Sequence, residues 1–380
     1  MANLHFSRNT KVFMEIGSNI WQLPVQQDFS FSQATNSSEI TVSEMESSGG
    51  TSRRGRKMFN DSLAPAEWSF NTYMRPNMGE NRGSAVEEAL WAAMCAHEGV
   101  TYNSSTKNWS DSLTRTTDEV NTPQNSELTI DFQESNRSSL MTFNLYFVMG
   151  GCGTSSNNFA AGDATTIYKI RDCVVGSVSA DFDIDGIAML AWSGFGAKIT
   201  EEATLNAGSA ISTGSAATDN FIRNRLTQLV IAREDVAQTY DLTLTGGSIS
   251  IENNITFLTP DTLCKVDEPI GHVTGTRNVS GSFTCYLSST TTPVNESGDL
   301  WEDLIEASSV VTNNFNLNFK VGGTTANQPR VEFAMSDCHL EIPSHSIDDI
   351  ISLEVNFHAL PSNLDTADEI TVKYIGYEQP

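Results

Sequence analysis

A pattern of short alternating strands that recurs in the same order in both halves of the chain limits the possible folds more than any other feature. The clearest strand pair spans residues 178–192, where apolar residues from Val178 to Ile184 alternate with polar ones at the period of a half-buried strand. Asp185-Gly186 follows, a dipeptide that favours the positive φ angles of a two-residue turn. This stretch predicts a β-hairpin with one apolar and one acidic face.

Sequence matches in the same order relate the two halves. They pair 29–32 with 249–252, 69–74 with 282–287, Leu90-Trp91 with Leu300-Trp301, Asp172-Cys173 with Asp337-Cys338, and the 178–192 hairpin with 346–355. A single match means little because β-strands resemble one another, but an ordered series around a helix indicates a duplication. The alternative is one large irregular β-sandwich.

The repeat predicts a mainly β chain with minor α content, built from two tandem related β-sandwich or β-barrel domains, each with one flanking helix. The first domain is expected to span 1–200 and the second 221–380, with a linker region at 201–220. Because the first copy is longer, we place its insertions in the polar stretches 100–126 and 150–165.

Each half contains one segment with helical spacing. In the first half the helix is expected at 85–96, where Ser84 and Glu87 have the spacing of a capping box and apolar residues follow at helical intervals. Residues 299–306 show the same kind of spacing in the second half.

A long loop is expected at 43–57, after an early strand at 25–32 and a return strand that includes Ile40 and Val42. The loop ends in a basic run made of Arg53, Arg54, Arg56 and Lys57. As a nucleic-acid hook the run is short and isolated. The other interpretations are a solvated loop tip and a contact in which the basic loop of one subunit meets the acidic face of the next.

The charge balance excludes a class of functions. Acidic residues outnumber basic ones 47 to 22, for a formal net charge of −25. This charge repels nucleic acid and anionic membranes, so a protein that grips DNA by its phosphates is not expected, whereas one that lets DNA slide past is compatible. The N-terminus lacks a signal-peptide core and no apolar run approaches membrane-spanning length, which predicts a soluble protein made in a cytoplasm.

No catalytic, cofactor or metal constellation stands out. Residues 181–186 match the opening of an EF-hand loop, but Trp192 occupies the position where that loop needs a glutamate. The glycines at 150–153 lack the spacing of a phosphate-binding loop, and no His-Glu-x-x-His occurs. We therefore predict that the chain is no enzyme and takes neither a cofactor nor a metal.

The cysteines show no Cys-x-x-Cys pair, so a zinc site is not expected. They are Cys95, Cys152, Cys173, Cys264, Cys285 and Cys338. Synthesis in a cytosol favours reduced and mostly buried thiols. The alternative is that some of them cross-link after assembly outside the cell.

The matched segments resemble bacteriophage tail tube proteins that contain two fused tube domains. The resemblance rests on 29–32, 69–74, Leu90-Trp91, 178–192 and their counterparts in the second half, and it covers most of the chain. It implies homotrimeric, pseudo-hexameric rings that stack into a hollow tube, in which strands of adjacent subunits join into one barrel. It also implies an acidic lumen through which double-stranded DNA passes during ejection without specific binding.

The resemblance further implies site residues, partners and location. The loop 43–57, with its basic run, is expected to reach the neighbouring ring, and Asp181 and Asp183 are the acidic residues expected to face the lumen. Tail sheath or other tail proteins are the expected partners, and the virion is the expected location after synthesis in the host cytoplasm, without a membrane. The alternatives are a baseplate hub with two tube-like domains and a β-sandwich adhesin or capsid decoration protein.

One physical argument supports assembly without the resemblance. Alternating strands leave sheet edges whose backbone groups need partners. A heterologous contact repeated around an axis pairs all such edges.

Overall fold

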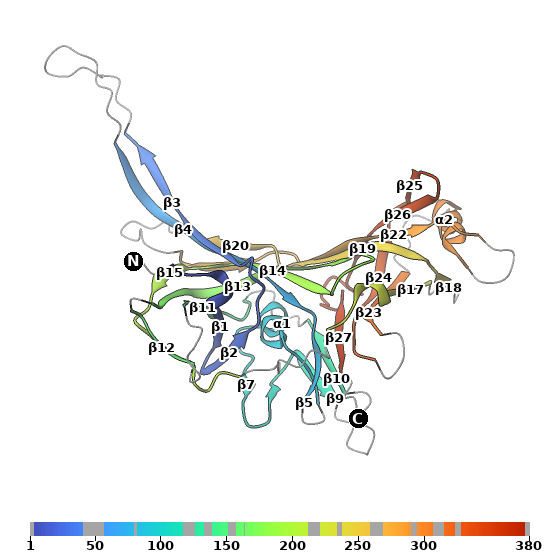
Figure 1. Cartoon of the computed structure of the whole chain (residues 1–380). Helices are drawn as coiled ribbons and strands as arrows, with labels where there is room; N and C mark the ends of the chain where they lie inside the picture. The colour runs from blue at the N-terminus through green and yellow to red at the C-terminus, as the bar shows by residue number, and fades with distance from the viewer. Residues whose placement is uncertain are drawn as a thin grey trace, which may run out of the picture.

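The computed structural model describes residues 4–40, 57–79, 82–116, 126–132, 139–150, 157–162, 164–211, 221–233, 238–258, 269–289, 295–306, 315–323 and 328–376. Within these ranges the chain is mainly β, as predicted, with the helices α1 (Glu88–Cys95) and α2 (Ser297–Glu306) (Figure 1). The second helix lies where the spacing predicted it.

The strands of the first half are numbered along the chain. They are β1 (Lys11–Ile16), β2 (Asn19–Leu23), β3 (Ser30–Glu39), β4 (Met58–Tyr73), β5 (Pro76–Gly79), β6 (Arg82–Ala85), β7 (Tyr102–Asn103), β8 (Asn108–Trp109), β9 (Leu113–Thr116), β10 (Ser126–Asp131), β11 (Phe143–Met149), β12 (Asn158–Ala160), β13 (Thr166–Phe182), β14 (Met189–Gly196), β15 (Lys198–Glu201) and β16 (Thr204–Asn206).

The second half continues the numbering. Its strands are β17 (Gln228–Arg233), β18 (Gln238–Asp241), β19 (Leu244–Glu252), β20 (Ile255–Leu258), β21 (Gly271–Thr274), β22 (Asn278–Tyr286), β23 (Phe315–Gly322), β24 (Arg330–Leu340), β25 (Ser344–Ile347), β26 (Ile351–Ala359) and β27 (Thr371–Gly376).

The strand pairs follow one order in both halves. In the first half, β2 pairs with β1, β1 with β11, β11 with β13, β13 with β14, β14 with β4, and β4 with β3. In the second half, β18 pairs with β17, β17 with β23, β23 with β24, β24 with β26, β26 with β22, and β22 with β19. The order is that expected for a duplication, while the boundaries of the two predicted domains stay a prediction.

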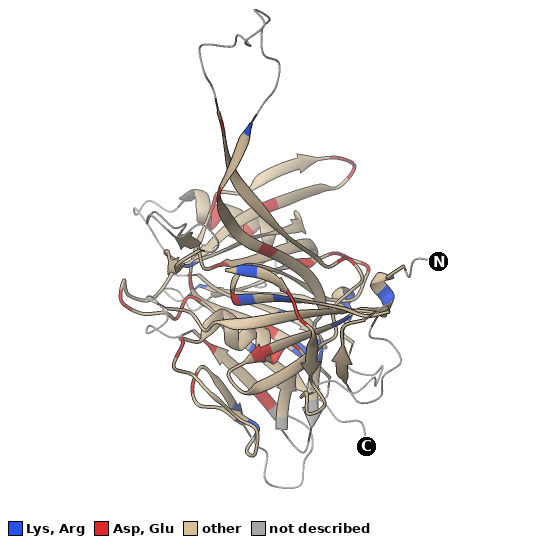
Figure 2. Cartoon of the chain, turned by 90° about the vertical axis from the view of Figure 1, so that its left-hand side faces the viewer, with Lys and Arg blue, Asp and Glu red and all other residues tan. Residues whose placement is uncertain are grey.

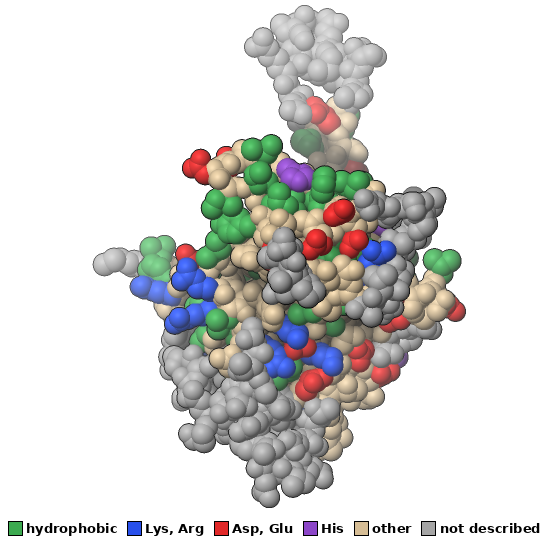
Figure 3. Space-filling model, turned by 90° about the vertical axis from the view of Figure 1, so that its right-hand side faces the viewer, with side chains coloured by type: hydrophobic (Ala, Val, Ile, Leu, Met, Phe, Trp, Pro, Cys, Tyr) green, Lys and Arg blue, Asp and Glu red, His purple; other side chains and the backbone are tan. Residues whose placement is uncertain are grey.

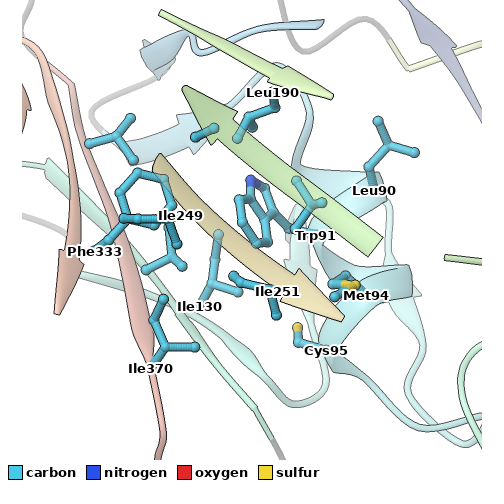
Figure 4. Packing of buried hydrophobic residues seen from close by; sticks show 14 of the residues in the cluster. Leu90, Trp91, Met94, Cys95, Ile130, Leu190, Ile249, Ile251, Phe333 and Ile370 are labelled. Atoms are coloured by element: carbon cyan, nitrogen blue, oxygen red, sulfur yellow. The ribbon is translucent and has the colours of Figure 1, made fainter. Parts of the chain in front are cut away.

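Two strand pairs and the core join the halves. The end of β13 pairs with β19, and β10 pairs with the last strand, β27. A single cluster of buried apolar side chains takes residues from both halves. Figure 4 shows Trp91 of α1 close to Ile249 and Ile251 of β19, with Leu190 of β14 and Phe333 of β24 nearby.

The predicted hairpin at 178–192 is present, but its turn is longer than two residues. β13 and β14 pair antiparallel, with Ser179 opposite Ala191, and then separate. On their outer edges, β13 pairs with β19 from Ser177 to Phe182, and β14 pairs with β4 along its whole length from Met189 to Gly196. The ends of the two strands, Ala180 to Phe182 and Met189 to Leu190, pair only with these outer neighbours. Asp185-Gly186 therefore lies in a wider loop, where Gly186 has a φ of 125°, and Ile184 is exposed rather than on the apolar face.

The prediction of a return strand at Ile40 was wrong. β3 continues to Glu39 and pairs with β4 out to Met58, so the two strands form an arm that rises from the body (Figures 1 and 2). Asn36 to Ser38 lie in this extension, and their side chains are exposed. A strand segment with neither face buried carries no apolar alternation, which explains the error. Val42 lies outside the described residues.

The prediction of a capping box at Ser84 was also wrong. Ser84 belongs to β6, α1 begins at Glu88, and no side chain caps its first turn. Every residue of α1 is buried, so the helix is a core element without a solvent face. Arg115 compensates the buried charge of Glu88 with an ion pair of 2.6 Å.

The Glu87 side chain points inward instead of capping the helix. The Tyr374 hydroxyl of β27 donates a hydrogen bond of 2.6 Å to its carboxylate, and the Trp91 indole donates one of 2.8 Å to the Tyr374 oxygen. Burial raises the pKa of Glu87 to about 7, against the lowering effects of the Tyr374 hydrogen bond and of Arg75. A polar cluster therefore links α1 to the C-terminal strand.

The expected insertions contain short strands where they are described. β7, β8 and β9 lie within 100–126, and β12 lies within 150–165. β12 pairs with β16, which lies inside the predicted linker region 201–220. Phe159 and Leu205 pack in a small separate cluster of buried side chains, so this part of the linker region is folded onto the first half.

Candidate functional surface

One continuous sheet face forms the upper layer of the molecule in Figure 1. It consists of β3, β4, β14, the end of β13, β19, β22 and β26 in this order, with β25 at its far edge. Alternate side chains point down into the core, among them Trp68, Phe70, Trp192, Ile249 and Phe283. Because successive residues of a strand point to opposite faces, the residues between them form the upper face.

Serine residues dominate this upper face. In register across neighbouring strands, Ser30 faces Ser69, Ser69 faces Ser193, and Ser193 faces Ser177. The hydroxyls of Ser30 and Ser69 lie 2.8 Å apart, and those of Ser177 and Ser193 lie 2.7 Å apart. Serine side chains are short, and two hydroxyls that hydrogen-bond to each other use part of their hydrogen-bonding capacity on one another. The upper face is therefore smooth and only weakly polar.

The second half continues the serine face. Ser179 faces Ser250, Ser250 faces Ser280, and Ser248 faces Ser282. The sequence analysis missed this surface, although serine at every second position of these strands was the available signal. The serines of separate strands lie next to one another because of the order in which the strands pair, and the sequence does not give this order.

The strands of this surface contain no lysine and no arginine. The sequences of β3, β4, β14, β19, β22, β25 and β26 hold neither, and β13 holds none after Arg171. The chain has 22 basic residues elsewhere, and those within the described residues lie mainly in the body below the arm in Figure 2. Acidic residues do occur here, including Glu67, Asp181 and Glu354, so the face is neutral to negative.

The predicted acidic residues separate in the structure. Asp181 is exposed on the upper face, where it lies opposite Ser248 of β19. Asp183 is exposed in the loop after β13, next to the strands that form the face. Neither carboxylate belongs to a described group of residues able to hold a metal ion.

The arm carries apolar residues at its far end. Met58 and Phe59 of β4 are 57% and 60% exposed, and Ile40 is exposed beside them. Of the predicted basic run, Lys57 is described and exposed, whereas Arg53, Arg54 and Arg56 lie outside the described residues. The interpretation of 43–57 as an inter-ring loop stays a prediction.

Four cysteines are free thiols buried in the core, namely Cys95, Cys173, Cys285 and Cys338. Burial raises the pKa of the Cys285 thiol to about 11 and that of Cys338 to about 12. Their surroundings disfavour the reactive thiolate. Cys152 and Cys264 lie outside the described residues, and cross-linking after assembly stays a prediction for all six cysteines.

The described residues contain neither a candidate membrane span nor a candidate metal cluster. Among the described residues, neither helix has the length and apolarity needed to cross a bilayer. In the same ranges, no three His, Cys, Asp or Glu side chains gather closely enough to bind a metal ion.

Comparison with known proteins decides the family. The model of the phage tail tube protein family matches residues 64–359. The chain is also 31% identical over 389 residues to tail tube protein pb6 of Escherichia phage T5, an alignment that covers 99% of this chain and 76% of that protein. This chain belongs to the phage tail tube protein family.

Membership makes the chain a structural component of the virion. The family match begins in β4 and ends at the last residue of β26, so it spans the upper face except for β3. Except for β3 and the first residues of β4, the surface without basic residues therefore lies within the region that matches the family.

Proposed function

We propose that three copies of this chain form a pseudo-hexameric ring, that rings stack into a tube, and that the serine-rich upper face lines the channel for double-stranded DNA. The observation that carries the proposal is the absence of lysine and arginine from the strands of this face. DNA binds proteins through phosphate contacts with cationic side chains. A wall without them offers no such contact, and its carboxylates repel the duplex.

The arm supports stacking in the same proposal. β3 and β4 project from the body as the arm, and the exposed Ile40, Met58 and Phe59 lie at the end of its described part. Exposed apolar side chains at the tip of a projection favour contact with another molecule. A basic run that meets the acidic surface of a neighbouring ring adds orientation.

Electron microscopy of the purified protein tests the proposal. Open-ended tubes with a six-fold appearance in cross-section are expected. Deletion of 43–57 should abolish stacking and leave single rings. Discrete native trimers would favour a baseplate hub, monomers would favour an adhesin or decoration protein, and unchanged tubes after the deletion would refute the role of the loop.

A further inference from the structure

The two halves can be aligned residue by residue through two shared details. Phe143 pairs with Cys173 at a shift in register, and Phe315 pairs with Cys338 at a shift of the same kind. Cys173 and Cys338 therefore occupy equivalent positions. In the same way Ser30 faces Ser69 and Ser248 faces Ser282, so Ser30 and Ser248 are equivalent. The sequence match of 29–32 with 249–252 was therefore wrong by two residues, because alternating strands match equally well after a shift of two.

The junction between the halves uses one segment from each. Ser177 to Phe182 of β13 pair antiparallel with Glu252 to Gly247 of β19. Counted from Cys173 and Cys338, the segment of the second half that corresponds to the β13 segment is 342–347, which contains β25. Counted from Ser30 and Ser248, the segment of the first half that corresponds to 247–252 is 29–34, at the start of β3.

Both counterpart segments have a free edge within the described chain. β25 pairs with β26 on one side, and β3 pairs with β4 on one side. No described strand pairs with the other edge of either one. Figure 1 places β3 at the left and β25 at the upper right, on opposite sides of the molecule, so one copy cannot join them to each other.

We propose that β25 of one copy pairs antiparallel with β3 of the next copy, in the register of the internal junction. Ser344 then faces Ser32, Ser346 faces Ser30 and Ile347 faces Phe29. The partner is a second copy of this chain, and the inference rests on the proposed ring. Repeated around an axis, the contact is heterologous and closes the ring.

Exposure at the free edge supports this partner. Ile342, Ile347 and Ile350 are 66%, 79% and 60% exposed, and Figure 3 shows hydrophobic side chains and a histidine gathered at the top of the face that includes this region. Natural proteins cover or charge free edges to prevent unwanted pairing. β25 contains only serine, histidine and isoleucine, so its edge lacks a protective charge.

The edge is also held in place. The His345 ring meets Trp301 of α2 edge-on, with 5.2 Å between the ring centroids. This contact braces β25 against the helix before a partner arrives. Pro343, which corresponds to Val178, has no N–H, so the ladder between copies depends on 344–347.

Cysteine pairs test the register directly. Under mild oxidation, Ser30→Cys with Ser346→Cys should give covalent oligomers on a non-reducing gel. The off-register pair, Ser32→Cys with Ser346→Cys, should give about tenfold less, because diagonal neighbours on paired strands lie beyond disulfide reach. The internal pair, Asp181→Cys with Ser248→Cys, is the matched control and should close within one chain. The native chain gives the background, and thermal melting verifies the fold of each variant.

Each outcome decides the inference. Oligomers from the in-register pair, together with a closed internal pair, support it. Equal yields from the in-register and off-register pairs overturn the register. An in-register pair that stays open while electron microscopy shows tubes overturns the inference and leaves the proposed function intact. If the internal pair forms no disulfide, the register of the junction between β13 and β19 is not as described. The inference, which copies that register, is then overturned as well.

Discussion

At the scale of single residues, Glu87 is a carboxylic acid kept in the core by hydrogen bonds from Tyr374 and from the backbone N–H of Arg75. Its pKa is about 7 in the fold, against an ordinary value of 4.5. The folded chain therefore holds a proton that the unfolded chain has already lost in this interval. Below about pH 4.5 the stabilising effect of this proton is complete, and it is lost as the pH rises through 7.

The variant Glu87→Gln should remove this dependence. Relative to the native chain, its free energy of unfolding should rise between pH 5 and pH 8, by up to about 3 kcal/mol for a shift of this size. Urea denaturation at both pH values measures the difference. Glu67→Gln, an exposed change on the upper face, controls for the loss of one negative charge, and parallel pH profiles of native chain and Glu87→Gln would contradict the assignment.

At the scale of elements, two glycines make room for aromatic rings across strand pairs. Gly194 of β14 faces Trp68 of β4, and Gly281 of β22 faces Phe357 of β26. A Cβ at Gly194 would overlap the Val174 carbonyl oxygen, and one at Gly281 would overlap that of Ser248. The pair β14–β4 of the first half corresponds to the pair β26–β22 of the second half. The glycine lies on β14 in the first pair but on β22 in the second, and the aromatic residue lies on the other strand each time.

Gly194→Ala and Gly281→Ala should each destabilise the fold by about 1–3 kcal/mol or more, because the added methyl group cannot be accommodated without moving a strand. Thermal or urea unfolding measures the loss. Gly162→Ala is the control, since a Cβ there meets no heavy atom within 4 Å. Equal stability of all three variants would show that the sheet yields more easily than its packing indicates.

The arm is the second element with a testable property. Met58→Ser together with Phe59→Ser removes exposed apolar side chains and touches no buried contact. We expect unchanged thermal stability of the free chain and shorter or absent tubes in electron micrographs. Leu364→Ser, at a fully exposed leucine of another loop, should leave tube length unchanged. Tubes of native length from the arm variant would exclude these residues from stacking.

The elements also show what the sequence could predict. Val178, Ala180 and Phe182 are buried as their alternation indicated, because period two follows directly from a half-buried strand. The sequence predicted that Glu87 caps the helix. Its hydrogen bond with Tyr374 could not be predicted, because Tyr374 is far away in the sequence. The width of the loop between β13 and β14 was missed for the same reason, since the pairing of the two strand ends with β19 and β4 is a tertiary property.

At the scale of the whole molecule, the family and the mainly β fold were predicted, while the surface proposed to contact DNA was not. Net charge indicated only an acidic chain. The concentration of basic residues away from one face depends on strand order, so it appears only when the strands are paired. Asp181 is exposed on that face, and its role in a lumen stays a proposal.

Reversing the charge of the face tests its role in the assembled particle. Asp181→Lys with Glu354→Lys places two cations on the upper face, where both native carboxylates are exposed. Virions built with this variant should release DNA more slowly, with a delay that diminishes at high salt. Glu98→Lys with Asp365→Lys makes the same charge change away from the face. Identical release from both variants would mean that the face does not meet DNA.

The arm gives the two halves different outlines. The ladder of β3 and β4 continues to Glu39 and Met58, whereas that of β19 and β22 stops at Glu252 and Asn278, and β20 and β21 pair separately beyond it. The ring of three chains that we propose therefore returns to itself after a third of a turn and not after a sixth. A component that binds the end of such a tube can do so in three equivalent orientations about the tube axis. A threefold-symmetric component would match that end without a symmetry mismatch.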